Sequence, residues 1–145
     1  MKFGILGFTI ISFFACNHAP EQGSQQESNV ADLEGVYEYH KGRDSIRLEL
    51  NAKGDSLIGS LDYAFYEKDR NSGVFRAVVQ DSILRGKYTF NSEGQSSTRE
   101  IVFGIVPNGL IEGFGEVKEI DGIMVFNDIK SLQYNHGMLL TKKTN

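Results

Sequence analysis

The alternation of apolar and polar residues with a period of two constrains the fold of this chain more than any other feature of its sequence. It is clearest at Ile46, Leu48 and Leu50, which are separated by single charged residues. Successive side chains of a β-strand point to opposite faces, so this pattern is typical of a strand with one buried face. After Asp32, no window of eleven residues has apolar groups at helical spacing. The sequence therefore predicts an all-β domain over residues 32–145.

The connections between the predicted strands are short and carry turn residues such as glycine, asparagine and aspartate. The strands are expected at residues 33–40, 44–51, 56–66, 73–80, 82–91, 98–106, 110–118, 122–126 and 137–143. Parallel strands need long crossover connections, for which these short turns leave no room. We therefore expect an antiparallel meander of about eight or nine strands.

A repeated pattern on four of these strands favours a curved sheet. In each stretch a large apolar residue is followed two positions later by glycine, as in Leu33–Tyr39, Leu57–Tyr63, Leu84–Phe90 and Ile111–Val117. Inward-facing glycine lets a sheet coil tightly, which a small closed barrel requires. The alternative is that short strands share glycine and tyrosine through composition alone.

A closed barrel of eight strands encloses an interior that side chains fill or that holds one small ligand. The residues expected to face inward are Tyr37, Tyr39, Leu48, Leu50, Leu57, Leu61, Tyr63, Phe65, Leu84, Tyr88, Phe90, Ile101, Phe103 and Val117. In strand number and spacing, the domain resembles the lipocalin-like β-barrels found among small envelope lipoproteins. This resemblance implies a fold and carries no function with it.

The first sixteen residues predict an export signal. A positively charged start precedes an uncharged, largely apolar run over residues 3–15, which is too short to span a bilayer and fits a secretory signal. The run ends at Phe13-Phe14-Ala15-Cys16, which contains the sole cysteine of the chain. This ending resembles the signal of bacterial lipoproteins, which implies that residues 1–15 are removed and that the cysteine is acylated. The alternatives are a retained membrane anchor and a buried, inert cysteine.

Residues 16–31 are expected to form the lipidated Cys16 and a flexible tether. The segment after the cysteine is polar and has no aromatic residue, so it cannot bury enough surface to fold. A lone histidine within it, His18, has no second ligand nearby and is not interpreted as a metal site. These features predict a domain that is lipid-anchored in the cell envelope, with a membrane as its partner and the outer membrane favoured.

The composition argues against several classes of function. The chain of 145 residues has 15 basic and 19 acidic residues, and its net charge of -4 does not favour a nucleic-acid partner. A single cysteine excludes a cysteine-based zinc site, and His40 and His136 are separated by nearly the whole domain. The sequence has no Gly-x-Ser-x-Gly elbow for a nucleophile. We therefore expect a protein that is not an enzyme, with no catalytic residues, metal or other cofactor.

Three residues are candidates for ligand binding: Arg76, Tyr63 and Tyr88. Arg76 lies in the apolar run 74–79, and if it points inward it would be a buried cation suited to a carboxylate ligand. The alternative is that its neighbours face inward and Arg76 is solvated. The charged loop 67–71 follows an aromatic cluster and suits either a recognition rim or a solvated hairpin tip.

The carboxylates are expected to face water. A general acid or base would need a desolvated carboxylate with a shifted pKa. Glu112 and Glu116 instead fit cross-strand charge pairs with Arg85 and Lys87 that aid solubility. The sequence therefore predicts no catalytic pair among them.

Two hypotheses of function follow. The first is a membrane-anchored, non-enzymatic envelope lipoprotein that binds a small apolar ligand in or at the mouth of its barrel. The second is a structural, protein-binding or inhibitor module with a filled barrel, which would bind an envelope protein through loops 67–73 and 91–97. A cavity with a few polar groups favours the first, and a packed interior with an exposed apolar patch favours the second.

Overall fold

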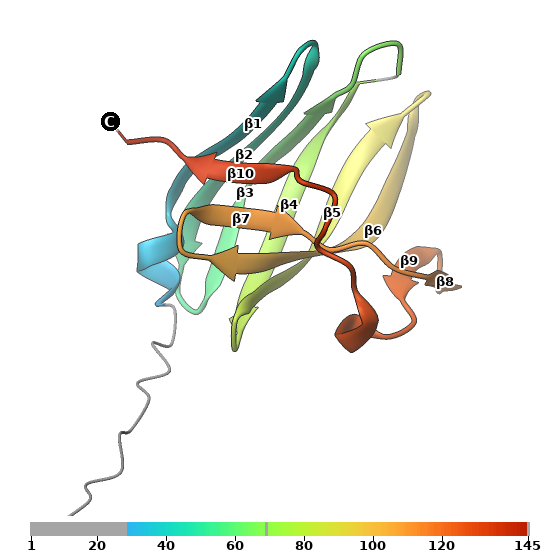
Figure 1. Cartoon of the computed structure of the whole chain (residues 1–145). Helices are drawn as coiled ribbons and strands as arrows, with labels where there is room; N and C mark the ends of the chain where they lie inside the picture. Colours follow the sequence, from blue (N-terminus) through green and yellow to red (C-terminus); the bar gives the residue numbers. More distant parts are fainter. Residues whose placement is uncertain (1–28, 69, 145) are drawn as a thin grey trace, which may run out of the picture.

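The computed structural model describes residues 29–68 and 70–144 (Figure 1). These residues form ten strands and two single-turn 3-10 helices. In chain order they are η1 (Val30–Leu33), β1 (Gly35–Lys41), β2 (Asp44–Lys53), β3 (Ser56–Ala64), β4 (Asn71–Gln80), β5 (Ile83–Ser92), β6 (Gln95–Val106), β7 (Gly109–Glu112), β8 (Val117–Ile120), β9 (Ile123–Phe126), η2 (Ile129–Ser131) and β10 (Leu139–Lys142). Within this part of the chain, no helix has the length and apolar character to cross a membrane.

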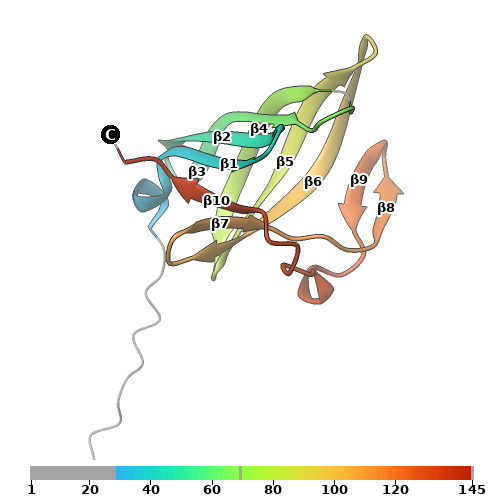
Figure 2. The same ribbon diagram turned by 45° about the horizontal axis from the view of Figure 1, so that its top comes forward.

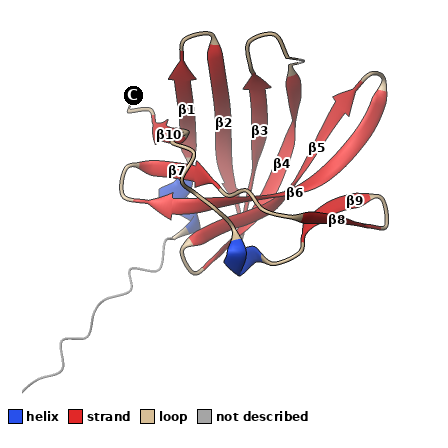
Figure 3. Cartoon of the chain, turned by 45° about the vertical axis from the view of Figure 1, so that its right-hand side comes forward, coloured by secondary structure: helices blue, strands red, loops and turns tan. Residues whose placement is uncertain are grey.

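Eight of the strands, β1 to β7 and β10, form a closed antiparallel barrel, which confirms the predicted all-β, lipocalin-like fold (Figures 1 and 3). The order β5-β4-β3-β2-β1-β10-β7-β6 runs once around the ring, and β5 pairs with β6 to close it. The remaining strands, β8 and β9, form a hairpin that projects at one side of the barrel (Figure 2). This hairpin joins the barrel through a short parallel pairing of β9 with β6, which the sequence did not predict.

The residues predicted to face inward form the core, with one exception. The fully or nearly fully buried members are Tyr37, Leu48, Leu50, Leu57, Leu61, Tyr63, Leu84, Tyr88, Ile101 and Phe103. Tyr39, Phe65 and Phe90 are partly buried and pack against this core. The exception is Val117, which is 47% exposed on the projecting hairpin, so its predicted place in the core is wrong.

The predicted strand at residues 110–118 is in fact two strands, β7 and β8, because the chain leaves the barrel after Glu112. The chain between β7 and β8 contains Gly113 and Gly115, and side chains of the segment between β9 and β10 pack directly on the backbone of these two glycines. Tyr134 Cε1 lies 2.8 Å from where a Cβ of Gly113 would stand, and Leu132 Cδ2 lies at the same distance from that of Gly115. These glycines therefore make room for the packed segment, and the strand ends where it crosses.

The domain begins slightly earlier than predicted. Asn29 caps η1, Val30 packs against the core and Leu33 is buried, so residues 29–31 belong to the barrel domain and not to the tether. The hydroxyl of Tyr37 donates a 3.0 Å hydrogen bond to the carbonyl oxygen of Leu33, which fixes η1 against β1. The predicted signal sequence and Cys16 lie outside the described residues.

Two of the repeated glycines on the inner face lie where neighbouring backbone leaves no room for a side chain. A Cβ on Gly59 would overlap the carbonyl oxygen of Glu49, and one on Gly86 would overlap that of Arg76. The ring of Phe75 also covers Gly86, with its Cε2 atom 2.7 Å from the same Cβ position. Adjacent strands therefore approach each other more closely here than residues with side chains would allow.

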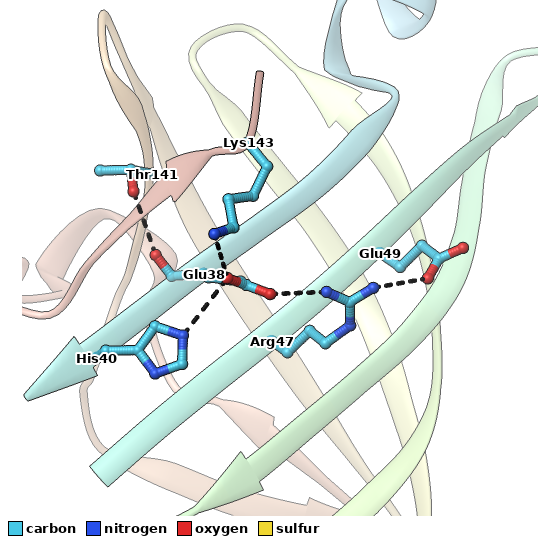
Figure 4. A network of polar contacts seen from close by, with 6 residues as sticks. All are labelled: Glu38, His40, Arg47, Glu49, Thr141 and Lys143. Carbon is cyan, nitrogen blue, oxygen red and sulfur yellow. Dashed lines mark hydrogen bonds and ion pairs between the residues drawn. The ribbon is translucent and has the colours of Figure 1, made fainter. Parts of the chain in front are cut away.

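The carboxylate of Glu38 connects the strands that close the barrel (Figure 4). It accepts a 2.7 Å hydrogen bond from Arg47 Nη1 on β2, and it lies 3.1 Å from Lys143 Nζ, just after β10, and 3.4 Å from His40 Nε2 on β1. The hydrogen bond with Lys143, together with those from Arg47 and His40, lowers the pKa of Glu38 to about 2 against the effect of desolvation. Charge contacts thus join β10 to β1 and β2 on the outer surface.

We expect Gly59→Ala to lower the free energy of unfolding by about 1–3 kcal/mol, because the new methyl group forces β2 and β3 apart. Gly104→Ala is the matched control, since the atom nearest to a Cβ at that position is a side-chain atom of Tyr134 at 3.3 Å and not a backbone atom. Urea denaturation of both variants measures the difference. Equal losses in the two variants would show that the close approach at Gly59 does not constrain the sheet.

Candidate functional site

Glu112, the last residue of β7, is the one buried charged residue in the described part of the chain. It is 4% exposed, and the hydroxyl of Tyr63 on β3 donates a 2.8 Å hydrogen bond to its Oε2. Burial raises the pKa of Glu112, although the Tyr63 hydroxyl and Arg99 oppose the shift. The prediction that Glu112 faces water in a pair with Arg85 or Lys87 is therefore wrong.

Arg99 on β6 holds its guanidinium group among three aromatic rings. Its Cζ lies 5.3 Å from the ring centroid of Tyr63, 5.6 Å from that of Tyr88 and 5.8 Å from that of Phe90, within the range of cation–π attraction. Its Nε is buried and has no hydrogen-bond partner. Among the described residues, no carboxylate lies within ion-pair distance of Arg99. The protein thus holds this cation in place without a direct ion pair among the described residues.

The hydroxyl of Tyr88 is the second unpartnered polar group of this cluster. The ring of Tyr88 stacks on that of Phe90 at 4.9 Å and meets the edge of Tyr63 at 5.9 Å. Burial raises the pKa of Tyr88 to about 12, with Arg99 opposing the shift. The hydroxyl therefore stays protonated at neutral pH and can donate a hydrogen bond.

These groups lie beside a cleft of about 240 Å³ between the barrel wall and the β8–β9 hairpin. Arg99, Glu100 and Glu112 contribute the charged side chains of its lining. Its apolar walls are formed by Ile101, Phe114, Val117, Met124 and Phe126. The cleft thus combines apolar walls with a cation and two carboxyl groups, and small-molecule sites commonly pair apolar walls with a few polar groups in this way.

Glu100 fixes the hairpin against β6. Its Oε2 accepts a 2.9 Å hydrogen bond from the backbone N–H of Phe126, and its Oε1 accepts one of 2.6 Å from Arg85 Nε. The Glu100 side chain is 8% exposed and that of Arg85 is 40% exposed, so the contacts are partly shielded from water. The cleft therefore owes its shape to a part-buried, charge-assisted contact as well as to the short β6–β9 pairing.

His136 fastens the segment between β9 and β10 to β7. Its Nε2–H donates a 2.5 Å hydrogen bond to the carbonyl oxygen of Glu112, and its Nδ1 accepts one of 3.2 Å from the N–H of Met138. Both ring nitrogens are occupied by backbone, and the Glu112 carboxyl is bonded to Tyr63 instead. The arrangement serves to hold the segment and does not form an acid–base pair. His40, by contrast, is exposed on β1 and contacts Glu38.

The structure brings together two of the three candidate ligand residues. Tyr63 and Tyr88 lie side by side in the interior, as predicted. Arg76 is exposed on the outer face of β4, because Phe75 and Ala77 take the inward positions. The proposed interior role of Arg76 is therefore wrong, and the alternative that it is solvated is confirmed.

Sequence reasoning missed Arg99, although the signal was present. Arg99 shares the strand face of Ile101 and Phe103, both predicted to point inward, so alternation alone places it toward the interior. Glu112 likewise shares a face with Leu110, which is fully buried.

The remaining expectations concern loop 67–71, Cys16 and metal binding. Beside the loop, Tyr66 is 47% exposed and the guanidinium of Arg43 lies 3.8 Å from its ring centroid.

Residue 69 and Cys16 are outside the described residues. Within the described ranges, no three His, Cys, Asp or Glu side chains gather in a way that could hold a metal ion.

Comparison with known proteins assigns no family to the chain. No family model matches it, and neither a curated protein nor a solved structure matches it significantly.

We expect Glu112→Gln to be more stable than the unchanged protein at neutral pH. The folded-state pKa of Glu112 lies above its ordinary value of 4.5, so the folded protein loses stability as pH rises from there through the raised pKa. Glutamine keeps an oxygen for the Tyr63 hydroxyl and does not ionise. The difference should grow with pH by about 1.4 kcal/mol for each unit by which the pKa is raised.

Urea unfolding of both proteins at several pH values between about 4 and 8 measures this difference. Glu116→Gln, at an exposed carboxylate four residues along the chain, is the control and should show no such growth. A difference between Glu112→Gln and the unchanged protein that is constant across this range would contradict the raised pKa.

Proposed function

We propose that this protein is a lipid-anchored, non-enzymatic lipoprotein of the cell envelope that binds a small amphipathic molecule in the cleft beneath its β8–β9 hairpin. The observation that carries the proposal is the Arg99 guanidinium, held by aromatic rings beside an apolar cleft with its Nε unpartnered. A buried donor without a partner costs free energy, which a bound acceptor would recover. The ligand that fits has an anionic end and an apolar body.

The burial of Glu112 is compatible with an anionic ligand. Burial raises the pKa of Glu112, which weakens the repulsion between this carboxyl group and a bound anion. The Tyr88 hydroxyl offers a second donor in the same cluster. The apolar body of the ligand would contact the walls contributed by Phe114, Met124 and Phe126. The binding site is thus beside the barrel, whose core is filled by side chains.

The anchor is proposed from the sequence. The signal-like residues 1–15 and the sole cysteine, Cys16, support acylation, and one chain end would then be held at a membrane, with the outer membrane favoured. The described chain begins at residue 29, so twelve residues separate it from Cys16. As a flexible coil they would span about 20 Å, enough for the domain to move near the surface.

A protein-binding role is the second candidate, supported by exposed apolar side chains on and beside the hairpin. Phe114, Val117, Ile120 and Met124 are between 38% and 49% exposed. Val117 and Met124 lie on one face of the hairpin and Ile120 on the other. Exposed apolar side chains gathered in this way are typical of sites that bind other proteins. Val117, Met124 and Phe114 also line the cleft, so a peptide segment would be the competing ligand there.

We expect Arg99→Met to weaken binding of dodecanoate by about tenfold to a hundredfold, the value of a charge-assisted hydrogen bond. Isothermal titration calorimetry with dodecanoate and with dodecanol measures the contribution of the anionic end. Arg43→Met is the matched control, because it removes an exposed arginine from the β1–β2 turn, outside the cleft lining, and should leave the affinity unchanged.

The outcomes separate the two functions. Equal affinity for dodecanoate and dodecanol, unaffected by Arg99→Met, would contradict recognition of an anion. Failure to bind either molecule would favour the protein-binding role, for which Ile120→Ser should then abolish recovery of an envelope protein.

Metabolic labelling with palmitate tests the anchor. The unchanged chain should incorporate the label and fractionate with membranes, and Cys16→Ser should lose both, because the substitution removes the sole thiol that could carry the acyl chain. Labelling that persists in Cys16→Ser would show that Cys16 is not the lipid carrier.

A further inference from the structure

The outer face of β3, β4 and β5 carries cations over an apolar floor. The side chains of Arg76 and Lys87 stand on opposed positions of neighbouring strands, beside Ile58 and Val78. A groove of about 420 Å³ runs between them. Val78 is 39% exposed, and the next apolar side chain along β4, Val74, is 40% exposed. We call the surface formed by Lys53, Ile58, Arg76, Val78 and Lys87 the basic face.

The opposed pair on the basic face has no compensating carboxylate. Like charges directly opposite each other on paired strands destabilise a sheet, and most exposed strand pairs avoid them. Glu100 on β6 lies directly opposite Lys87 on β5. Its carboxylate, however, accepts hydrogen bonds from Arg85 and from the N–H of Phe126. Within the described chain, neither Arg76 nor Lys87 lies within ion-pair distance of an acidic group. This local excess of positive charge contrasts with the net charge of -4.

The chain enters the barrel at the end of the sheet where the basic face begins. The carboxylate of Glu34, just after η1, accepts a 2.7 Å hydrogen bond from the N–H of Ala52, and Lys53 is the next residue. Lys53 pairs with Ser56, which in turn pairs with Val78, so one row of the sheet leads from this entry point into the basic face. Figure 1 shows η1 and the β2–β3 turn at the same end of the barrel.

We propose that the basic face is a docking surface for a membrane with anionic lipid headgroups. Charge complementarity favours this partner, and the exposed Val74 and Val78 suit contact with the headgroup region. The choice of a membrane as the partner rests on the proposed anchor, because acylation of Cys16 would place a membrane within reach of the point where the chain enters the barrel. The surface itself is independent of the ligand cleft. Docking there would hold the barrel against the membrane in one orientation.

Partition of the full chain carrying Cys16→Ser onto lipid vesicles at low ionic strength tests this proposal without requiring acylation. Sedimentation compares vesicles of phosphatidylglycerol with vesicles of phosphatidylcholine. Tighter binding to phosphatidylglycerol is expected. The double variant Arg76→Gln/Lys87→Gln should lower that partition by roughly fivefold for each charge removed. Asp81→Asn, in the adjoining β4–β5 turn, should raise it.

Lys118→Gln/Lys130→Gln is the matched control, since it removes two exposed cations from the hairpin and from η2 with the same change in net charge. It should leave the partition nearly unchanged. Equal binding to the two lipids, or an equal loss in both double variants, would overturn the proposal. Either result is independent of dodecanoate binding and of palmitate labelling, so failure here is distinguishable from failure of the proposed function.

Discussion

Closure of the sheet is the constraint on which the rest of this structure depends. Eight strands form a ring only because the four residues of β10 bridge β1 and β7, pairing with both. A ring this small requires strong coiling, and Gly59 and Gly86 permit the close backbone approach that goes with it. Closure also removes the two free edges of the barrel sheet, which would otherwise be available for pairing with other chains. The charge contacts of Glu38 reinforce the same seam from the outside.

The shortness of the closing strands also creates the candidate site. β7 pairs only with the second half of β6, from Phe103 onward, so the first half of β6 has an edge that the barrel does not use. β9 pairs with that edge at Thr98 and Arg99, and the hairpin then stands against the barrel wall with the cleft between them. Arg99 and Glu112 lie where the filled core meets this cleft. A cation without an ion pair and a buried carboxyl group are tolerated there, because aromatic ring faces contact the cation and the Tyr63 hydroxyl contacts the carboxyl group.

The sequence predicted what depends on local alternation and could not predict what depends on distant packing. Strand positions, the antiparallel order and most of the core follow from the period of two. The same rule, applied to β6, would also have placed Arg99 inside, on the face of Ile101 and Phe103. At β7 the rule was applied in the wrong phase, because the pattern Ile111–Val117 turned Ile111 inward, whereas Leu110 and Glu112 are the buried residues. By contrast, the parallel contact between β6 and β9 involves two residue pairs and has no local signal. The break at Gly113 likewise depends on Tyr134, which is distant along the chain.

Glu100 connects the cleft and the basic face through one carboxylate. Its Oε2 holds the N–H of Phe126 and thereby the hairpin, and its Oε1 holds Arg85. Both oxygens are therefore engaged, and the carboxylate does not form an ion pair with Lys87, which is its direct partner across β5 and β6. The contact that shapes the cleft thus leaves Lys87 and Arg76 uncompensated on the outer surface. The same carboxylate therefore holds the hairpin over the cleft and, because it contacts Arg85 and Phe126, leaves Lys87 without an ion-pair partner on the basic face.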